Sequence, residues 1–121
     1  MEVKEIGNIG LGVFATQDYH ADDIIEDCHI IALSELDKNK IDETHIYNYY
    51  YSWGDNEAAI ALGNGSLYNH SYTPNAKYVK LYNKKIIRFI AIKNIHAGEE
   101  IRTNYNGNPT SKKLLWFKVD A

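Results

Sequence analysis

The chain has 121 residues, of which 45% are hydrophobic and 24% charged, and its formal net charge is −3. A chain of this length and balance suits one globular domain and is unlike disordered or fibrous proteins. No run approaches the roughly 18 apolar residues of a membrane span, and the start of the chain lacks a basic region followed by an apolar one. We therefore expect a single soluble domain over residues 1–121, without a signal peptide, in the cytoplasm or, for a viral or effector protein, in a host nucleus.

Charge is distributed unevenly along the chain. Residues 1–60 carry 13 acidic and 3 basic side chains, whereas residues 61–121 carry 3 acidic and 10 basic ones. The acidic half could attract a basic peptide or form an ordinary solvated face. The basic residues between positions 77 and 93 could protect a sheet edge or contact nucleic acid; we favour edge protection and expect no direct nucleic-acid contact. They are Lys77, Lys80, Lys84, Lys85, Arg88 and Lys93.

Short runs rich in β-branched and aromatic residues, separated by turn formers, predict a mainly β protein. Asn83 and Lys84 join two of these runs and predict the turn of a hairpin. Strands do not alternate with long amphipathic helices, which argues against a doubly wound nucleotide-binding domain. The predicted strands are Gly12–Thr16, Ile24–Leu33, Ile60–Leu62, Tyr78–Tyr82, Ile86–Ile92 and Ile101–Asn104.

One or two short helices are predicted between the second and third of these strands. Ser34, with Asp37 three positions later, is typical of a capped helix start. A second helical turn is expected between Asp42 and Tyr50.

Cysteine and histidine are sparse. Cys28 stands alone, so it cannot form an internal disulfide, and we expect it to be a small buried hydrophobe. The histidines do not have the H-x-x-x-H spacing of a close ligand pair, so a metal-dependent hydrolase is our weakest hypothesis and we expect no metal. They are His20, His29, His45, His70 and His96.

Three stretches carry residues suited to a ligand site. The first and the third favour a structural role when taken alone, and the second suits either a satisfied turn or a ligand site. In NIGLGVFAT, Gly10 and Gly12 would let the backbone approach a ligand or turn sharply. GSLYNHSYTPNA sets hydrogen-bonding side chains beside the apolar Leu67 and Tyr68, and buried polar groups need partners. HAGEEIRTNYNG places Tyr105, with its hydroxyl donor and acceptor, at the end of a predicted strand.

Together, and in this order, the three stretches resemble the SET-domain family of protein lysine methyltransferases. The resemblance covers nearly the whole chain. YYYSW strengthens it, since this stretch is similar to the aromatic segment of small bacterial and viral-type members. It implies a SET-domain (β-clip) fold of small antiparallel sheets with a knot-like threading of the C-terminal part. Its most specific residues are Asn69, His70, Ser71, Pro74 and Asn75, followed by Gly98–Tyr105.

The resemblance implies an enzyme that transfers a methyl group from S-adenosylmethionine to a lysine amine of a protein, leaving S-adenosylhomocysteine. Tyr105 and Tyr49 would be catalytic, and Tyr49, Tyr51 and Trp53 would line the channel for the substrate lysine. The cofactor would be bound by Gly10, Leu11, Gly12, Asn69, His70, Tyr105 and Trp116.

The cysteine-rich flanks of many chromatin-acting relatives are missing, so another segment would have to cover the cofactor. We expect the tail from about residue 107 to 121 to do so, with Trp116 or Phe117 stacked on the adenine or packed on the core. The expected partner is a lysine-bearing protein or peptide, such as a basic tail, and a homodimer is expected by analogy alone. The alternative function is a SET-like module that binds peptides without catalysis, for which Asn69 or Tyr105 would be expected to be altered.

Overall fold

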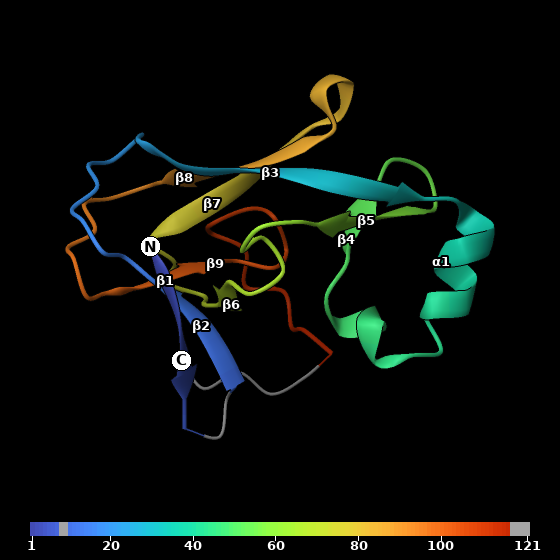
Figure 1. Ribbon diagram of the computed structural model, residues 1–121, viewed down its shortest axis with the longest axis horizontal. Helices are drawn as coiled ribbons and strands as arrows, with labels where there is room; N and C mark the ends of the chain where they lie inside the picture. Colours follow the sequence, from blue (N-terminus) through green and yellow to red (C-terminus); the bar gives the residue numbers. More distant parts are fainter. Residues whose placement is uncertain (8–9, 117–121) are drawn as a thin grey trace.

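The computed structural model describes residues 1–7 and 10–116, which form two small sheets (Figure 1). One sheet has the strand order β1-β2-β9-β6 and the other the order β4-β5-β3-β8-β7. In chain order the elements are β1 (Glu2–Ile6), β2 (Gly10–Phe14), β3 (Ile24–Leu33), α1 (Glu35–Ile41), η1 (His45–Asn48), β4 (Tyr51–Trp53), β5 (Glu57–Ala61), β6 (Asn69–His70), β7 (Ala76–Leu81), η2 (Tyr82–Lys84), β8 (Ile86–Ala91) and β9 (Glu100–Thr103).

The four-stranded sheet brings the central motif to the end of the chain. Strands β1, β2 and β9 are antiparallel, whereas β6 runs parallel to β9. In this parallel pair, Asn69 lies opposite Arg102 and His70 lies opposite Thr103. The register therefore sets the Asn-His pair beside the end of β9, two residues before Tyr105.

Strand β3 connects the two halves of the five-stranded sheet. Its first half, Ile24–His29, pairs with β8, and its second half, Ile30–Leu33, pairs with β5. Ten residues extend roughly 33 Å at about 3.3 Å per residue, long enough for two partners in succession on the strand. Figure 1 accordingly shows β3 running from the β7–β8 hairpin to β4, β5 and α1.

The core takes buried side chains from both sheets. On β8 the side chains of Ile87, Phe89 and Ala91 are all fully buried, the alternation expected of a strand with one face on the core. The ring of Tyr68 stacks on Phe89 with 4.2 Å between the ring centroids. Cys28 is buried as predicted.

The mainly β prediction is confirmed, and the predicted strand Ile24–Leu33 has the observed bounds. Both helical predictions are also confirmed. The hydroxyl oxygen of Ser34 accepts from the Asp37 backbone nitrogen at 3.2 Å and caps α1, and η1 lies within the predicted second turn. The sequence did not predict β1, β4 or β6, of which the last two have only three and two residues.

The predicted two-residue hairpin turn is wrong. Leu81 lies opposite Ile86, so four residues join β7 to β8, and they include the 3-10 turn Tyr82–Lys84. A two-residue turn of the type that suits twisted strands requires left-handed backbone at both positions, and the Asn-Lys pair has no glycine to supply it. Only Lys85 adopts that conformation here, with φ of 53°.

None of the described helices is long and apolar enough to cross a membrane.

Candidate active site

Tyr105 is held by three segments that are distant in the sequence. Its backbone nitrogen donates to Nδ1 of His70 at 2.9 Å, and its carbonyl oxygen accepts from the Tyr78 hydroxyl at 2.9 Å. Its own hydroxyl donates to the carbonyl oxygen of Tyr68 at 2.5 Å. These bonds restrain both the backbone and the ring, so the phenol oxygen has a defined position.

The Tyr105 hydroxyl remains protonated at neutral pH. Burial, followed by the nearby Tyr49, Glu100 and Tyr78, raises the pKa of Tyr105 above its ordinary value. Since its hydrogen is donated to Tyr68, the oxygen can act toward a ligand only as a hydrogen-bond acceptor. The group is suited to orienting a donor rather than to removing a proton.

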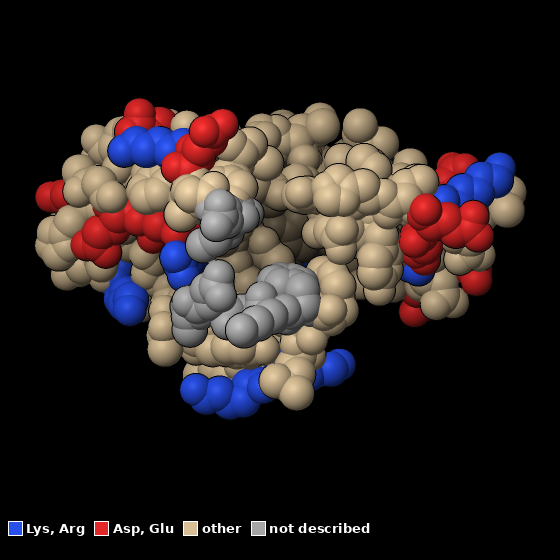
Figure 2. Space-filling view, turned by 90° about the horizontal axis from the view of Figure 1, so that it is seen from below, with Lys and Arg blue, Asp and Glu red and all other residues tan. Residues whose placement is uncertain are grey.

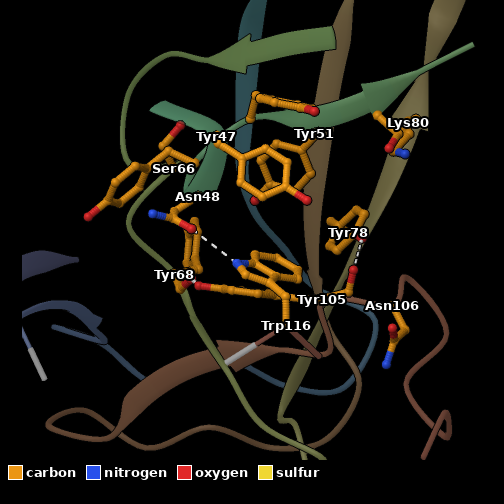
Figure 3. Close-up of a pocket in the computed structure, with 13 residues that line it drawn as sticks. Tyr47, Asn48, Tyr51, Ser66, Tyr68, Tyr78, Lys80, Tyr105, Asn106 and Trp116 are labelled. Carbon is orange, nitrogen blue, oxygen red and sulfur yellow. Dashed lines mark hydrogen bonds between the residues drawn. The ribbon is translucent and has the colours of Figure 1, made fainter. Parts of the chain in front are cut away.

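Tyr105 lies at one wall of a pocket of about 290 Å³ (Figure 3). Tyrosines make up most of the lining. The lining residues that the structure describes include no carboxylate and one side-chain amine. The lining residues are Tyr47, Asn48, Tyr49, Tyr50, Tyr51, Ser52, Ser66, Tyr68, Tyr78, Lys80, Tyr105, Asn106 and Trp116.

The tyrosines across the pocket are also fixed and neutral. The Tyr51 hydroxyl donates to the carbonyl oxygen of Gly65 at 2.6 Å, and its ring meets Tyr78 edge-on at 5.0 Å. Burial raises the pKa of Tyr78 to about 12 and raises that of Tyr51 well above the ordinary value. The pocket therefore presents ring faces and neutral hydroxyls, surroundings that favour a cation by about 0.5–2 kcal/mol per ring contact.

Trp116 covers one side of the pocket. Its ring stacks on Tyr105 with centroids 6.4 Å apart and 23° between the planes. Its indole nitrogen donates to Oδ1 of Asn48 at 3.0 Å, and Tyr47 lies beside it (Figure 3). The adenine contact expected of Trp116 stays a prediction, and the alternative residue Phe117 lies outside the described residues.

The three residues expected in the lysine channel are not all at the pocket. Tyr49 and Tyr51 line it, and 42% of Tyr49 is exposed. Trp53 is buried outside it, with its ring 4.6 Å from that of Tyr82. Its channel role stays a prediction that the present contacts do not favour.

Among the residues expected at the cofactor, Leu11, Gly12 and Asn69 form a second cluster, where β2, β6 and β9 meet. The side-chain amide nitrogen of Asn69 donates to the Leu11 carbonyl at 2.9 Å and to Oε2 of Glu100 at 2.7 Å. A Cβ on Gly12 would lie 2.6 Å from that same carboxylate oxygen and 3.1 Å from the Asn69 amide nitrogen, so a side chain at this position would displace the groups of the cluster. Gly10 has φ of 107° and open space where a side chain would stand.

His70 connects this cluster to Tyr105: it follows Asn69 on β6, and its ring bonds the Tyr105 backbone. Its Nδ1 accepts from Tyr105, so the hydrogen of the neutral ring is on Nε2. This Nε2 is buried and has no hydrogen-bond partner among the described residues, as is also true of Oγ1 of Thr103. Burial lowers the pKa of His70, so the ring is neutral at physiological pH.

Sequence reasoning missed Tyr68, Tyr78, Lys80 and Asn48 at the pocket. Tyr78 and Lys80 had a usable signal, because residues two apart on a strand share a face. Lys80 was instead interpreted as edge protection. Strand β7 is indeed at the edge of its sheet, but the Lys80 side chain lines the pocket.

No group of three or more His, Cys, Asp or Glu side chains that could hold a metal ion occurs within residues 1–7 and 10–116.

Known proteins similar to this chain carry the same fold and family signature. The family model described as SET domain matches residues 10–106. The chain is 27% identical over 122 residues to a Schizosaccharomyces pombe histone-lysine N-methyltransferase, H3 lysine-37 specific, covering 100% of this chain and 79% of that protein.

Solved structures agree. A Plasmodium falciparum protein assigned as a histone methyltransferase has a TM-score of 0.68 at 27% identity, covering 88% of this chain and 97% of that one. A chain of a ctPRC2 complex has a TM-score of 0.72 at 19% identity, covering 85% of this chain and 14% of that chain, a likeness of fold alone. With the motif residues gathered around Tyr105, the chain belongs to the SET-domain family of protein lysine methyltransferases.

Proposed function

We propose that the protein transfers a methyl group from S-adenosylmethionine to the side-chain amine of a lysine in a protein substrate. The observation that carries this proposal is the fixed Tyr105 hydroxyl at the wall of a pocket lined mostly by tyrosines. At about 290 Å³, the pocket is at the small end of the roughly 300–1,000 Å³ range of ligand pockets, so it suits one side chain better than a whole nucleoside cofactor.

The residues at the junction of β2, β6 and β9 fit the cofactor. Both N–H groups of the Asn69 amide are used within the protein, which leaves its Oδ1 to accept from an ammonium group. The buried Nε2–H of His70 lacks a partner among the described residues and could donate to a ligand or a water. Gly10, Leu11, Gly12, Asn69, His70, Tyr105 and Trp116 would hold the cofactor, which supplies a methyl group on a positively charged sulfur.

The chain's own residues would align the reacting lysine. Tyrosine faces favour the cationic form of the lysine for entry, but attack on a methyl group requires the neutral amine. Burial among aromatic rings disfavours the ammonium and so promotes loss of its proton to water. The lone pairs of the Tyr105 oxygen can then accept an N–H of the amine, directing its lone pair away from the phenol; alignment of this kind can be worth effective molarities of about 10⁵ M or more.

A histone is the substrate class that the similar proteins favour, since the Schizosaccharomyces pombe and Plasmodium falciparum proteins are both described by histone methylation. The acidic first half of the chain suits a basic acceptor protein such as a histone tail.

The test is to incubate the purified protein with methyl-labelled S-adenosylmethionine and a pool of basic proteins that includes histones. Tyr105→Phe runs alongside, with Tyr82→Phe as the matched control because Tyr82 is half exposed and outside the pocket. Label in lysine with the wild type and the control, but not with Tyr105→Phe, supports the proposal. Neither label in any protein of the pool nor cofactor binding would instead support the peptide-binding module that lacks catalysis.

A further inference from the structure

Lys80 is the one formally charged side chain among the described residues that line the pocket. It lies on β7 two positions after Tyr78, so both side chains leave the same face of the strand. Figure 3 shows it at the side of the pocket opposite Ser66 and Tyr68. An amine therefore stands at the edge of a pocket that, by the proposed function, receives a second amine.

Among the described residues, no acidic side chain compensates the Lys80 amine. Its side chain is half-buried, and within residues 1–7 and 10–116 no carboxylate pairs with it: the ion pairs of Lys4, Lys38, Arg88 and Arg102 involve other positions. No acidic residue lines the pocket in that part of the chain. Burial lowers the pKa of Lys80, as expected for an ammonium withdrawn from water without a counter-ion.

We propose that Lys80 recognises a carboxylate of the substrate, an Asp or Glu within about two residues of the lysine to be methylated. The inference rests on the proposed function, because it places the acceptor lysine in the pocket. A basic neighbour would add repulsion at Lys80, and an apolar one would bury the amine further without a partner. A carboxylate would neutralise it and so favour that peptide over one with a neutral side chain at the same position.

The limit of about two residues follows from the distance between successive residues of a peptide. Consecutive Cα atoms are about 3.8 Å apart, and Lys80 and Tyr105 line the same small pocket. A carboxylate close in sequence to the acceptor lysine can reach the pocket edge while that lysine is inserted. A distant one depends on how the rest of the substrate folds.

The test uses short peptides with a single acceptor lysine, in which one position within two residues of it is Glu, Gln or Arg. The measured quantity is the ratio of kcat/KM for the Glu peptide to that for the isosteric Gln peptide. We expect a ratio of about ten for the wild type at one or more positions, the order of one charge-assisted pair. Lys80→Met should bring the ratio to about one, and Lys80→Glu should reverse the preference toward the Arg peptide.

Lys77→Met is the matched control. Lys77 is on the same strand and also partly buried, but it does not line the pocket, so the wild-type ratio should persist. Because each ratio compares two peptides with one protein, a general loss of activity in a variant cancels.

A wild-type ratio near one at every position, or an unchanged ratio in Lys80→Met, would overturn the inference. The same peptides are also titrated by fluorescence anisotropy. If no peptide and no basic protein is methylated, the proposed function fails. A preference for the Glu peptide in binding that Lys80→Met removes would then still support the carboxylate contact. Binding without such a preference would overturn the contact.

Discussion

Nδ1 of His70 accepts a hydrogen bond from the backbone nitrogen of Tyr105 at 2.9 Å. A titratable ring therefore holds the backbone of Tyr105 in place. Protonation would place a hydrogen on that nitrogen and convert the acceptor into a donor. The position of Tyr105 is thereby coupled to the charge of His70.

This coupling predicts a loss of stability in mild acid. Burial lowers the folded pKa of His70 below its ordinary value of 6.5, so in acid the unfolded chain takes up the proton first. The contribution of neutral His70 to the free energy of unfolding is therefore complete above about pH 6.5. It is lost as the pH falls from there through the lower folded pKa of His70. Urea unfolding across this range should show the decline in the wild type and a smaller one in His70→Gln, whose amide oxygen can accept but cannot titrate.

The matched control for this pH dependence is His20→Gln, since 83% of the His20 side chain is exposed. Equal declines in the wild type, His20→Gln and His70→Gln would show that other groups cause the acid effect.

Replacing Tyr105 by Phe should lower kcat on the order of 10²-fold, because a positioned hydrogen-bonding group in an active site typically contributes that much or more. The affinity for S-adenosylmethionine should change only a few-fold, since the lost oxygen acts mainly on the reacting amine. Single-turnover rates and calorimetric binding separate the two quantities. Equal losses of rate and affinity would place the hydroxyl in ground-state binding instead.

Asn69→Ala should weaken cofactor binding about tenfold, because Oδ1 of Asn69 is the acceptor left over for the ligand. It should also lower the free energy of unfolding by roughly 1–2 kcal/mol, because the amide nitrogen joins Leu11 to Glu100. Calorimetry and urea unfolding measure the two effects separately. Unchanged affinity in a folded variant would remove Asn69 from the cofactor site.

The fully buried Tyr68 should be strongly coupled to Glu26 in its effect on the free energy of unfolding. Its hydroxyl donates to Oε1 of Glu26 at 2.7 Å, while Oε2 of the same carboxylate accepts from the Asn64 backbone nitrogen at 3.1 Å. Tyr68→Phe leaves a carboxylate oxygen without its donor and should lower the unfolding free energy by roughly 1.5–3 kcal/mol. A double-mutant cycle with Glu26→Gln should give a coupling of at least about 1 kcal/mol, and additive effects would contradict the contact.

Gly65→Ala should destabilise the chain by overpacking. An added Cβ would lie 2.5 Å from that of Ala61 and 3.1 Å from the sulfur of Cys28, both of which are buried. Crowding of this kind costs about 1–3 kcal/mol, measured as a shift of the urea midpoint. Adding Ala61→Gly should recover part of the loss; no recovery would mean that the Ala61 contact is not its cause.

Much of the fold follows from local patterns. The run Ile24–Leu33 predicts its strand correctly because both halves are paired, apart from a register shift between Ile24 and Glu26. Ser34 predicts the start of α1 because a cap is a contact between residues three apart. By contrast, β6 is invisible in the sequence, since its two residues are a strand only through their pairing with β9.

The pocket was only partly predictable. Tyr49, Tyr51 and Tyr105 were expected there on family resemblance and line it, whereas Trp53, drawn from the same aromatic segment, packs against Tyr82. Tyr51 and Trp53 lie two positions apart on β4 and so share a face of the strand, but the pocket includes Tyr51 and not Trp53. A motif does not state where along a strand a pocket ends.

The sequence by itself determined the mainly β class, the caps, the family and the residue types of the site, because these depend on composition and on contacts over a few positions. Only the tertiary structure decided that His70 bonds the backbone of Tyr105 and that the carbonyl of Tyr68 accepts from the Tyr105 hydroxyl. It also decided that Lys80 lines the same pocket as Tyr105. Those relationships join segments 25 or more residues apart. They depend on the register and packing of two sheets, which no local pattern encodes.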